Sequence, residues 1–179
     1  MVTDGSRIEP VFLKNSEGMY IGGTYEEYYQ SLYYASLENG EKEKIAGGLT
    51  EIIKMSKDEQ AVVFRKANAE GTAFDYFYAN QAGTEGQLIA ENVTVLDDED
   101  HKKVSQFEIN DDFTKAAFIQ GYDLANESGA LFVVSITNGV VGSDKKISDT
   151  AYSCNITPDG QTIRYADNYD IKWNLVTLN

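Results

Sequence analysis

The sequence predicts an all-β fold built from repeated four-stranded units, and three observations support this prediction. A short segment occurs three times, each time with an Asp followed six residues later by an aromatic residue. Among the 179 residues, Tyr and Phe are frequent (12 and 8), Gly is frequent (15) and Pro is rare (2). Aromatic residues favour strands, and Gly and Asp favour the tight turns between them.

The repeated segment predicts a tight hairpin turn that leads into a strand. It reads S-K-D-E-Q-A-V-V-F from position 56, N-D-D-F-T-K-A-A-F from 110 and T-P-D-G-Q-T-I-R-Y from 157. The Asp and aromatic positions of the three copies are Asp58 and Phe64, Asp112 and Phe118, and Asp159 and Tyr165. The Asp residues are 54 and 47 residues apart (112 − 58 and 159 − 112), within or close to the period of propellers and other repeat arrays. Since Asp side chains bond nearby backbone in turns, these positions are expected to be structural.

The first 23 residues resemble the end of such a unit. Asp4, Gly5 and Ile8 match the Asp, Gly and Ile of the third copy, which predicts a turn and a last strand. Residues 11–13 could form a further short strand. Residues 1–23 are therefore expected to form a partial unit.

Residues 25–39 allow two interpretations. Thr24 followed by Glu27 is a capping box, and tyrosines and leucines recur at helical spacing up to the Asn39-Gly40 stop. The alternative is a strand over 32–37, because 77–83 and 131–139 stand in the same place before the other two turns and end in similar polar-Gly turns. We favour the strand, after a short helical turn near 25–29.

Each unit is expected to contain four short strands. The predicted units span approximately 27–67, 73–121 and 129–167, and the second carries an insertion around 93–103. Residues 171–179 resemble the first strand of a further unit. No linker divides the chain, so we predict one domain over 1–179, with three full units and partial units at both ends, as part of a larger protein.

Four antiparallel strands in about 45 residues describe the blade of a β-propeller. The segments L-Y-Y-A-S-L-E-N-G-E-K-E-K-I (32–45) and C-N-I-T-P-D-G-Q-T-I-R-Y (154–165) resemble the WD40-like propeller repeats of TolB and of dipeptidyl-peptidase-type enzymes. The resemblance covers about 27–178. Asp58 and Asp112 lack the following Gly of this pattern, and only the third copy is close to it. The resemblance implies protein binding through loops at one end of the blades, here including parts of 67–73, 93–103 and 121–129.

Charge and composition limit the partners. The formal net charge is −14, from 29 acidic and 15 basic residues, so nucleic acid and anionic membrane surfaces are disfavoured. The sequence shows no signal peptide and no segment for membrane insertion. The single cysteine, Cys154, rules out an internal disulfide. We expect an extracellular, cell-surface or periplasmic location, as the resemblance implies, with the cytoplasm as the alternative.

No catalytic, cofactor or metal site is predicted. The only histidine, His101, follows four acidic residues, but their spacing lacks the alternating ligands and central Gly of a calcium loop, so a solvated loop is the preferred interpretation. A serine triad would need His101, and the sequence has no G-x-S-x-G elbow. Cys154 lies in a predicted core strand and is expected to be a buried hydrophobe rather than a nucleophile.

The predicted function is a non-catalytic interaction module that binds a protein or peptide, with self-association through exposed blade edges as a further option. One alternative is the substrate-gating propeller of a larger serine peptidase whose nucleophile lies on another domain. The other is carbohydrate binding by a tyrosine patch, for which Tyr25, Tyr28 and Tyr29 are the candidate contacts. Packing between blades is the structural interpretation of these tyrosines.

Overall fold

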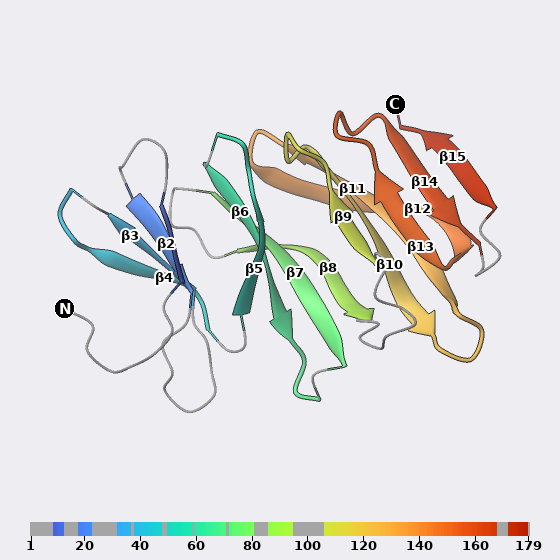
Figure 1. The fold of residues 1–179 in the computed structure, drawn as a ribbon, viewed down its shortest axis with the longest axis horizontal. Helices are drawn as coiled ribbons and strands as arrows, with labels where there is room; N and C mark the ends of the chain where they lie inside the picture. The colour runs from blue at the N-terminus through green and yellow to red at the C-terminus, as the bar shows by residue number, and fades with distance from the viewer. Residues whose placement is uncertain are drawn as a thin grey trace. The chain divides into compact units, whose positions relative to one another are not determined.

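A computed structural model describes residues 9–12, 18–22, 32–36, 38–47, 50–58, 60–70, 72–80, 86–94, 106–167 and 172–178. All regular structure in these residues is β-strand, which confirms the predicted all-β class (Figure 1). The strand interpretation of 32–37 is confirmed over 32–36, whereas residues 23–31, with the predicted helical turn, lie outside the described residues.

The strands form four antiparallel sheets. The first contains β1 (Glu9–Phe12), β2 (Gly18–Gly22), β3 (Leu32–Ser36) and β4 (Lys42–Ala46) in chain order. The second contains β5 (Thr50–Met55), β6 (Ala61–Ala67), β7 (Ala73–Asn80) and β8 (Gln87–Thr94). The third contains β9 (Phe107–Ile109), β10 (Lys115–Asp123), β11 (Ser128–Thr137) and β12 (Val140–Ala151). The fourth has three described strands, β13 (Ser153–Ile156), β14 (Thr162–Ala166) and β15 (Trp173–Thr177).

The sheets are shifted by two strands relative to the predicted units. The unit predicted over 27–67 holds β3 to β6, so it joins the last two strands of one sheet to the first two of the next. The N-terminal strands β1 and β2, assigned to a partial unit from the sequence, complete the sheet of β3 and β4. A tandem repeat fixes the period of the strands but not the strand at which a sheet starts, and a single residue, Tyr152, separates β12 from β13.

The chain divides into two compact units. One comprises Met1–Ala67 and Phe77–Gln87, and the other comprises Asn68–Tyr76 and Leu88–Asn179. The boundaries fall at the end of β6, within β7 and within β8. The single domain over 1–179 stays a prediction.

Each unit has its own hydrophobic core, formed by alternating residues of its strands. The core of the first unit contains Leu32, Ile45, Val62, Phe64 and Ala79. The core of the second unit contains Ala117, Ile119, Tyr122, Leu131, Val133, Ala151, Tyr152, Cys154, Ile156 and Ile163. In the second unit the core lies between the sheet of β9–β12 and the sheet of β13–β15, because both contribute to it. Burial of these apolar side chains is the main force that holds the sheets together.

Candidate functional site

The first Asp turn connects β5 to β6 and is closed by a network of side-chain hydrogen bonds. Ser56 Oγ donates to Asp58 Oδ1 (2.6 Å) and accepts from the amide of Ala61 (3.0 Å). The amide of Gln60 donates to the same Asp58 oxygen (3.2 Å). The amide of Ser56 donates to the carbonyl of Ala61 (2.9 Å). The turn is therefore fixed by a hydroxyl and a carboxylate acting together.

The third Asp turn connects β13 to β14 and repeats this network. Thr157 Oγ1 donates to Asp159 Oδ1 (2.6 Å) and accepts from the amide of Thr162 (3.0 Å). The amide of Gln161 donates to Asp159 Oδ1 (3.0 Å). Gly160, with φ +67°, occupies the left-handed region that suits glycine. The predicted turns at Asp58 and Asp159 are confirmed, and both join the first and second strands of a sheet.

The second copy, between β9 and β10, is closed by Asn110 rather than Asp112. Asn110 Oδ1 accepts from the amides of Thr114 and Lys115 (both 2.9 Å), and its side-chain amide donates to Thr114 Oγ1 (3.0 Å). Asp112 is exposed in this turn. The position of the turn is as predicted, but Asn110 closes it instead of the predicted Asp112. The side-chain amide of Asn110 can bind both the backbone and the hydroxyl of Thr114.

The same Asn turn occurs between β6 and β7, where the sequence interpretation saw only a loop. Asn68 Oδ1 accepts from the amides of Thr72 (3.0 Å) and Ala73 (3.4 Å), and its side-chain amide donates to Thr72 Oγ1 (3.2 Å). Asn68-x-x-x-Thr72 matches Asn110-x-x-x-Thr114, so the spacing N-x-x-x-T was the available signal. This turn joins the second and third strands of its sheet.

Stability should depend on the ionisation of Asp159. The hydroxyl of Thr157 and the amide of Gln161 lower the pKa of Asp159 below its ordinary value. A carboxyl whose pKa is lowered on folding adds stability above its unfolded pKa of about 4, and this is lost as the pH falls through the folded pKa. We therefore expect the free energy of unfolding of Asp159→Asn to decrease less than that of the wild type as the pH falls from about 4 to about 2. Urea unfolding at stepped pH measures this, and an unchanged profile in Asp159→Asn would contradict the expectation.

The repeated aromatic residues belong to the interior. Phe64 is buried and stacks on Phe77 with ring centroids 5.3 Å apart. Phe118 is buried and stacks on Phe132 at 5.6 Å. Tyr165 is half-buried and packs against the core of the second unit. The structural interpretation of these positions therefore agrees with their packing.

The residues singled out for chemistry fall into two groups. Cys154 is buried, and burial raises the pKa of its thiol, so the reactive thiolate is disfavoured. Tyr25, Tyr28, Tyr29 and His101 lie outside the described residues. Within the part of the chain that the structure describes, no group of three or more His, Cys, Asp or Glu side chains is arranged to hold a metal ion. The described residues also include no helix with the length and apolar character to cross a bilayer.

The loop between β10 and β11, residues 124–127, is the best-defined candidate for a binding surface. Asp123 accepts hydrogen bonds from the amide of Ala125 (2.8 Å) and the side chain of Asn126 (2.5 Å), and these bonds lower its pKa. Glu127 adopts a positive φ of 49°, which reverses the chain. Leu124, the first residue of the loop, is 66% exposed. The loop thus has a fixed shape and presents an apolar side chain to solvent.

Two buried polar side-chain atoms lie in the second unit, and one of them belongs to Tyr122, which directly precedes Asp123. The hydroxyl of Tyr122 and Oε1 of Gln106 are buried, and neither has a hydrogen-bond partner among the described residues. The other side-chain atom of Gln106, Nε2, donates to the carbonyl of Tyr152 (2.8 Å), whose ring lies 6.5 Å from that of Tyr122. Burial raises the pKa of Tyr122, with smaller contributions from Tyr152 and Glu127. The tyrosine is therefore neutral and keeps a hydroxyl that can donate.

The predicted binding loops belong to two kinds of connection. Residues 67–73 and 121–129 include second-to-third-strand turns, whereas 93–103 begins in the last two residues of β8 and continues toward the next sheet. In an antiparallel meander the second-to-third-strand turns lie at the end of the sheet opposite the Asp turns. Of the three, 121–129 is described throughout, whereas residue 71 and residues 95–103 lie outside the described residues.

No protein-family model matches the chain, and no curated protein matches it significantly. Solved structures do. The chain is similar to the β-propeller domain of the Trilobed protease from Pyrococcus furiosus, with a TM-score of 0.50 and 13% identity over 94% of this chain and 53% of that one. It is similar to a Mycobacterium tuberculosis puromycin-hydrolyzing peptidase, with a TM-score of 0.51 and 12% identity over 99% of this chain and 30% of that one.

The blades are of the β-propeller type. TolB from Acinetobacter baumannii is also similar, with a TM-score of 0.46 and 15% identity over 99% of this chain and 42% of that one. The predicted likeness to peptidase-type propellers is confirmed for the fold. The chain spans about half or less of the length of these three structures.

Proposed function

We propose that this chain is a non-catalytic interaction module that binds a protein or peptide partner through the loops at one end of its blades. The observation that carries the proposal is the loop 124–127, which is locked by Asp123 and presents the exposed side chain of Leu124. A preformed loop loses little conformational entropy on binding, so a single apolar contact there contributes more to affinity. Loops held on a rigid scaffold are the usual place for binding residues.

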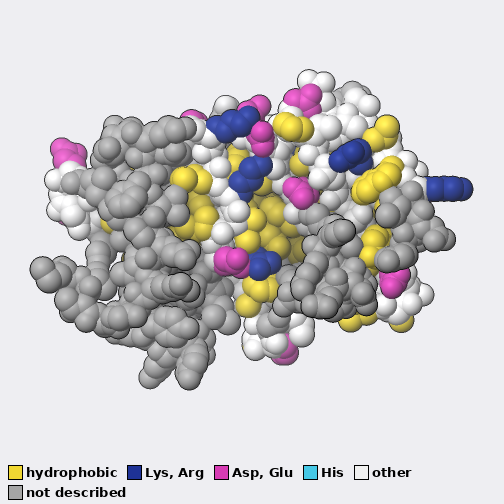
Figure 2. All heavy atoms as spheres, viewed as in Figure 1, with side chains coloured by type: hydrophobic (Ala, Val, Ile, Leu, Met, Phe, Trp, Pro, Cys, Tyr) yellow, Lys and Arg dark blue, Asp and Glu magenta, His cyan; other side chains and the backbone are white. Residues whose placement is uncertain are grey.

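The charge of the surface also favours a polypeptide partner. On the face shown in Figure 2, acidic and basic side chains are interspersed and hydrophobic side chains reach the surface between them. Mixed charge around apolar contacts resembles the rim and centre of protein interfaces. The net charge of −14 disfavours nucleic acid as the alternative partner.

The proposal predicts that Leu124→Ser weakens binding of selected peptides by at least tenfold. Peptides are selected from a random displayed library on the immobilised chain, and their affinities are measured by titration calorimetry. Val140→Ser is the matched control, because Val140 is 61% exposed beside the turn at the opposite end of the sheet. Equal effects of the two substitutions, or none from Leu124→Ser, would refute the role of this loop.

The lack of catalysis is part of the proposal, and the burial of Cys154 supports it. The peptidase alternative rests on the fold alone, and this fold occurs in proteins with many different functions. A G-x-S-x-G elbow in the full-length gene product would favour that alternative.

The carbohydrate hypothesis rests on Tyr25, Tyr28 and Tyr29, and a glycan array with Tyr28→Ala tests it. An extracytoplasmic location is proposed with the interaction function, and cell fractionation tests it.

A further inference from the structure

A pocket of about 220 Å³ lies along β8, within the second compact unit. Residues 88–91 of β8 line it, together with Phe118 and Gln120 of β10 and residues 142–144 of β12. Strand pairing brings the last two groups together, because Phe118 lies opposite Phe132, and Asp144 lies opposite Val134 two residues later on β11. The pocket is therefore built from strands that are far apart in the sequence.

The apolar lining of the pocket is open to solvent mainly at one side chain. Ile89, Ala90 and Phe118 are buried, whereas Leu88 is 42% exposed. The ring of Phe118 is held by stacking on Phe132, with ring centroids 5.6 Å apart. Leu88 is therefore the apolar group against which a ligand can bury methylene groups.

The charged lining of the pocket is acidic. Glu91 and Asp144 are exposed and line it, and none of the described residues that line it is basic. The lysines that follow Asp144 on β12 are engaged elsewhere. Lys146 donates to Asp149 (2.9 Å), and Lys145 lines a different pocket. An apolar side chain beside two carboxylates favours a ligand that is cationic at one end and apolar along its stem.

The uncharged polar lining favours arginine over lysine as that ligand. Nε2 of Gln120 donates to the carbonyl of Glu91 (3.1 Å), which fixes the side-chain amide and leaves Oε1 as an acceptor. Ser143 adds a hydroxyl oxygen to the two carboxylates. A guanidinium presents its N–H donors in a planar fork and can bind several of these oxygens at once, whereas an ammonium carries fewer donors.

We propose that the pocket along β8 binds an arginine side chain of a partner protein. The methylene groups of the arginine pack on Leu88, and its guanidinium binds the carboxylates of Glu91 and Asp144. Arginine is enriched among the residues that anchor protein interfaces. This pocket gives the interaction function a second surface, which does not depend on loop 124–127. Gln120 lies within β10, whereas that loop follows the end of the strand.

The probe is the capped tripeptide Gly-Arg-Gly, titrated into the isotopically labelled whole chain and followed by two-dimensional NMR. The backbone amide signals of 88–91 and 142–144 should shift and reach saturation. The same peptide with citrulline in place of arginine keeps the shape but loses the charge, and it should bind at least fivefold more weakly. Gly-Lys-Gly keeps the charge but loses the planar fork, and it should bind at least threefold more weakly.

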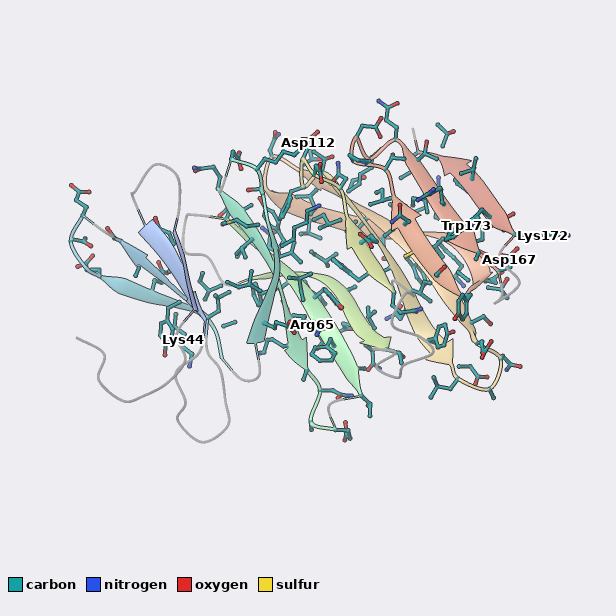
Figure 3. The ribbon with its side chains drawn as sticks, in the orientation of Figure 1. Lys44, Arg65, Asp112, Asp167, Lys172 and Trp173 are labelled. Atoms are coloured by element: carbon teal, nitrogen blue, oxygen red, sulfur yellow. The ribbon has the colours of Figure 1, made fainter. Side chains whose placement is uncertain are left out.

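Substitutions identify the groups that bind the probe. Asp144→Asn and Glu91→Gln should each weaken the binding of Gly-Arg-Gly at least threefold. Asp112→Asn, an equal change of charge on the exposed turn between β9 and β10, should have no effect (Figure 3). Leu88→Ser should also weaken binding, whereas Leu124→Ser, at another exposed leucine, should not. The last comparison separates the pocket from the loop surface.

Three results would overturn the proposal. The first is that the citrulline or the lysine peptide binds as tightly as Gly-Arg-Gly. The second is that Asp112→Asn weakens binding as much as Asp144→Asn does. The third is that the amides of 88–91 and 142–144 show no saturable shift. A wild-type dimer in sedimentation that Asp144→Asn dissociates would also contradict the proposal, because an arginine of a second copy would then occupy the pocket.

Discussion

Replacing Phe64 with alanine should lower the free energy of unfolding by about 3–5 kcal/mol. The ring is 1% exposed and stacks on Phe77. A methyl group built on Gly86 would lie 2.4 Å from Cζ of Phe64, so the ring fills its space closely. Its removal leaves a cavity that β6 and β7 cannot close without shifting paired strands. Urea unfolding followed by circular dichroism measures the loss.

The equivalent residue in the third sheet provides the comparison. Phe118 is also buried and stacked, so Phe118→Ala should cost about as much as Phe64→Ala. Leu124→Ala is the control for an exposed site and should change stability by less than about 0.5 kcal/mol. If Phe64→Ala fell within the range of the control, the repeated aromatic would not be a core position.

Asn110→Ala should lower the free energy of unfolding by about 2–3 kcal/mol. The side chain is 1% exposed, and its oxygen is the acceptor for the amides of Thr114 and Lys115. Alanine leaves both amides without that acceptor in a partly buried turn. It also leaves a void beside Gly160, since a methyl group on that glycine would lie 2.8 Å from the Asn110 amide nitrogen.

Asn68→Ala is the matched control for Asn110→Ala. Asn68 closes its turn with the same bonds but is half-exposed, so water can replace the lost acceptor. The expected cost is about 1 kcal/mol, again from urea unfolding. If Asn68→Ala lowered the free energy of unfolding more than Asn110→Ala, burial would not determine how much these turns stabilise the fold.

The sequence predicted the strands and the period because both depend on local patterns. The Asp turns of 56–61 and 157–162 are closed by residues within the turns themselves, so the sequence motif alone identifies them. The start of each sheet could not be predicted in this way. It depends on which strands pair at long range, and the single residue between β12 and β13 gives no local break.

The candidate surfaces were predictable only in part. Residues 121–129 follow from the resemblance, and the exposure of Leu124 fits this expectation. The pocket along β8 leaves no local signal, because Phe118 and Asp144 are brought together by strand register. Phe118 lies opposite Phe132, and Asp144 lies opposite Val134 two residues later on β11.

Nuclear Overhauser contacts between α-protons test the strand pairing most directly, because these protons approach closely at non-hydrogen-bonded pairs of antiparallel strands. We predict contacts from Ala117 to Val133 across β10 and β11, and from Arg164 to Leu175 across β14 and β15. We predict no such ladder between β12 and β13, which belong to different sheets. A continuous ladder between β12 and β13, or helical contacts within 32–36, would contradict the account.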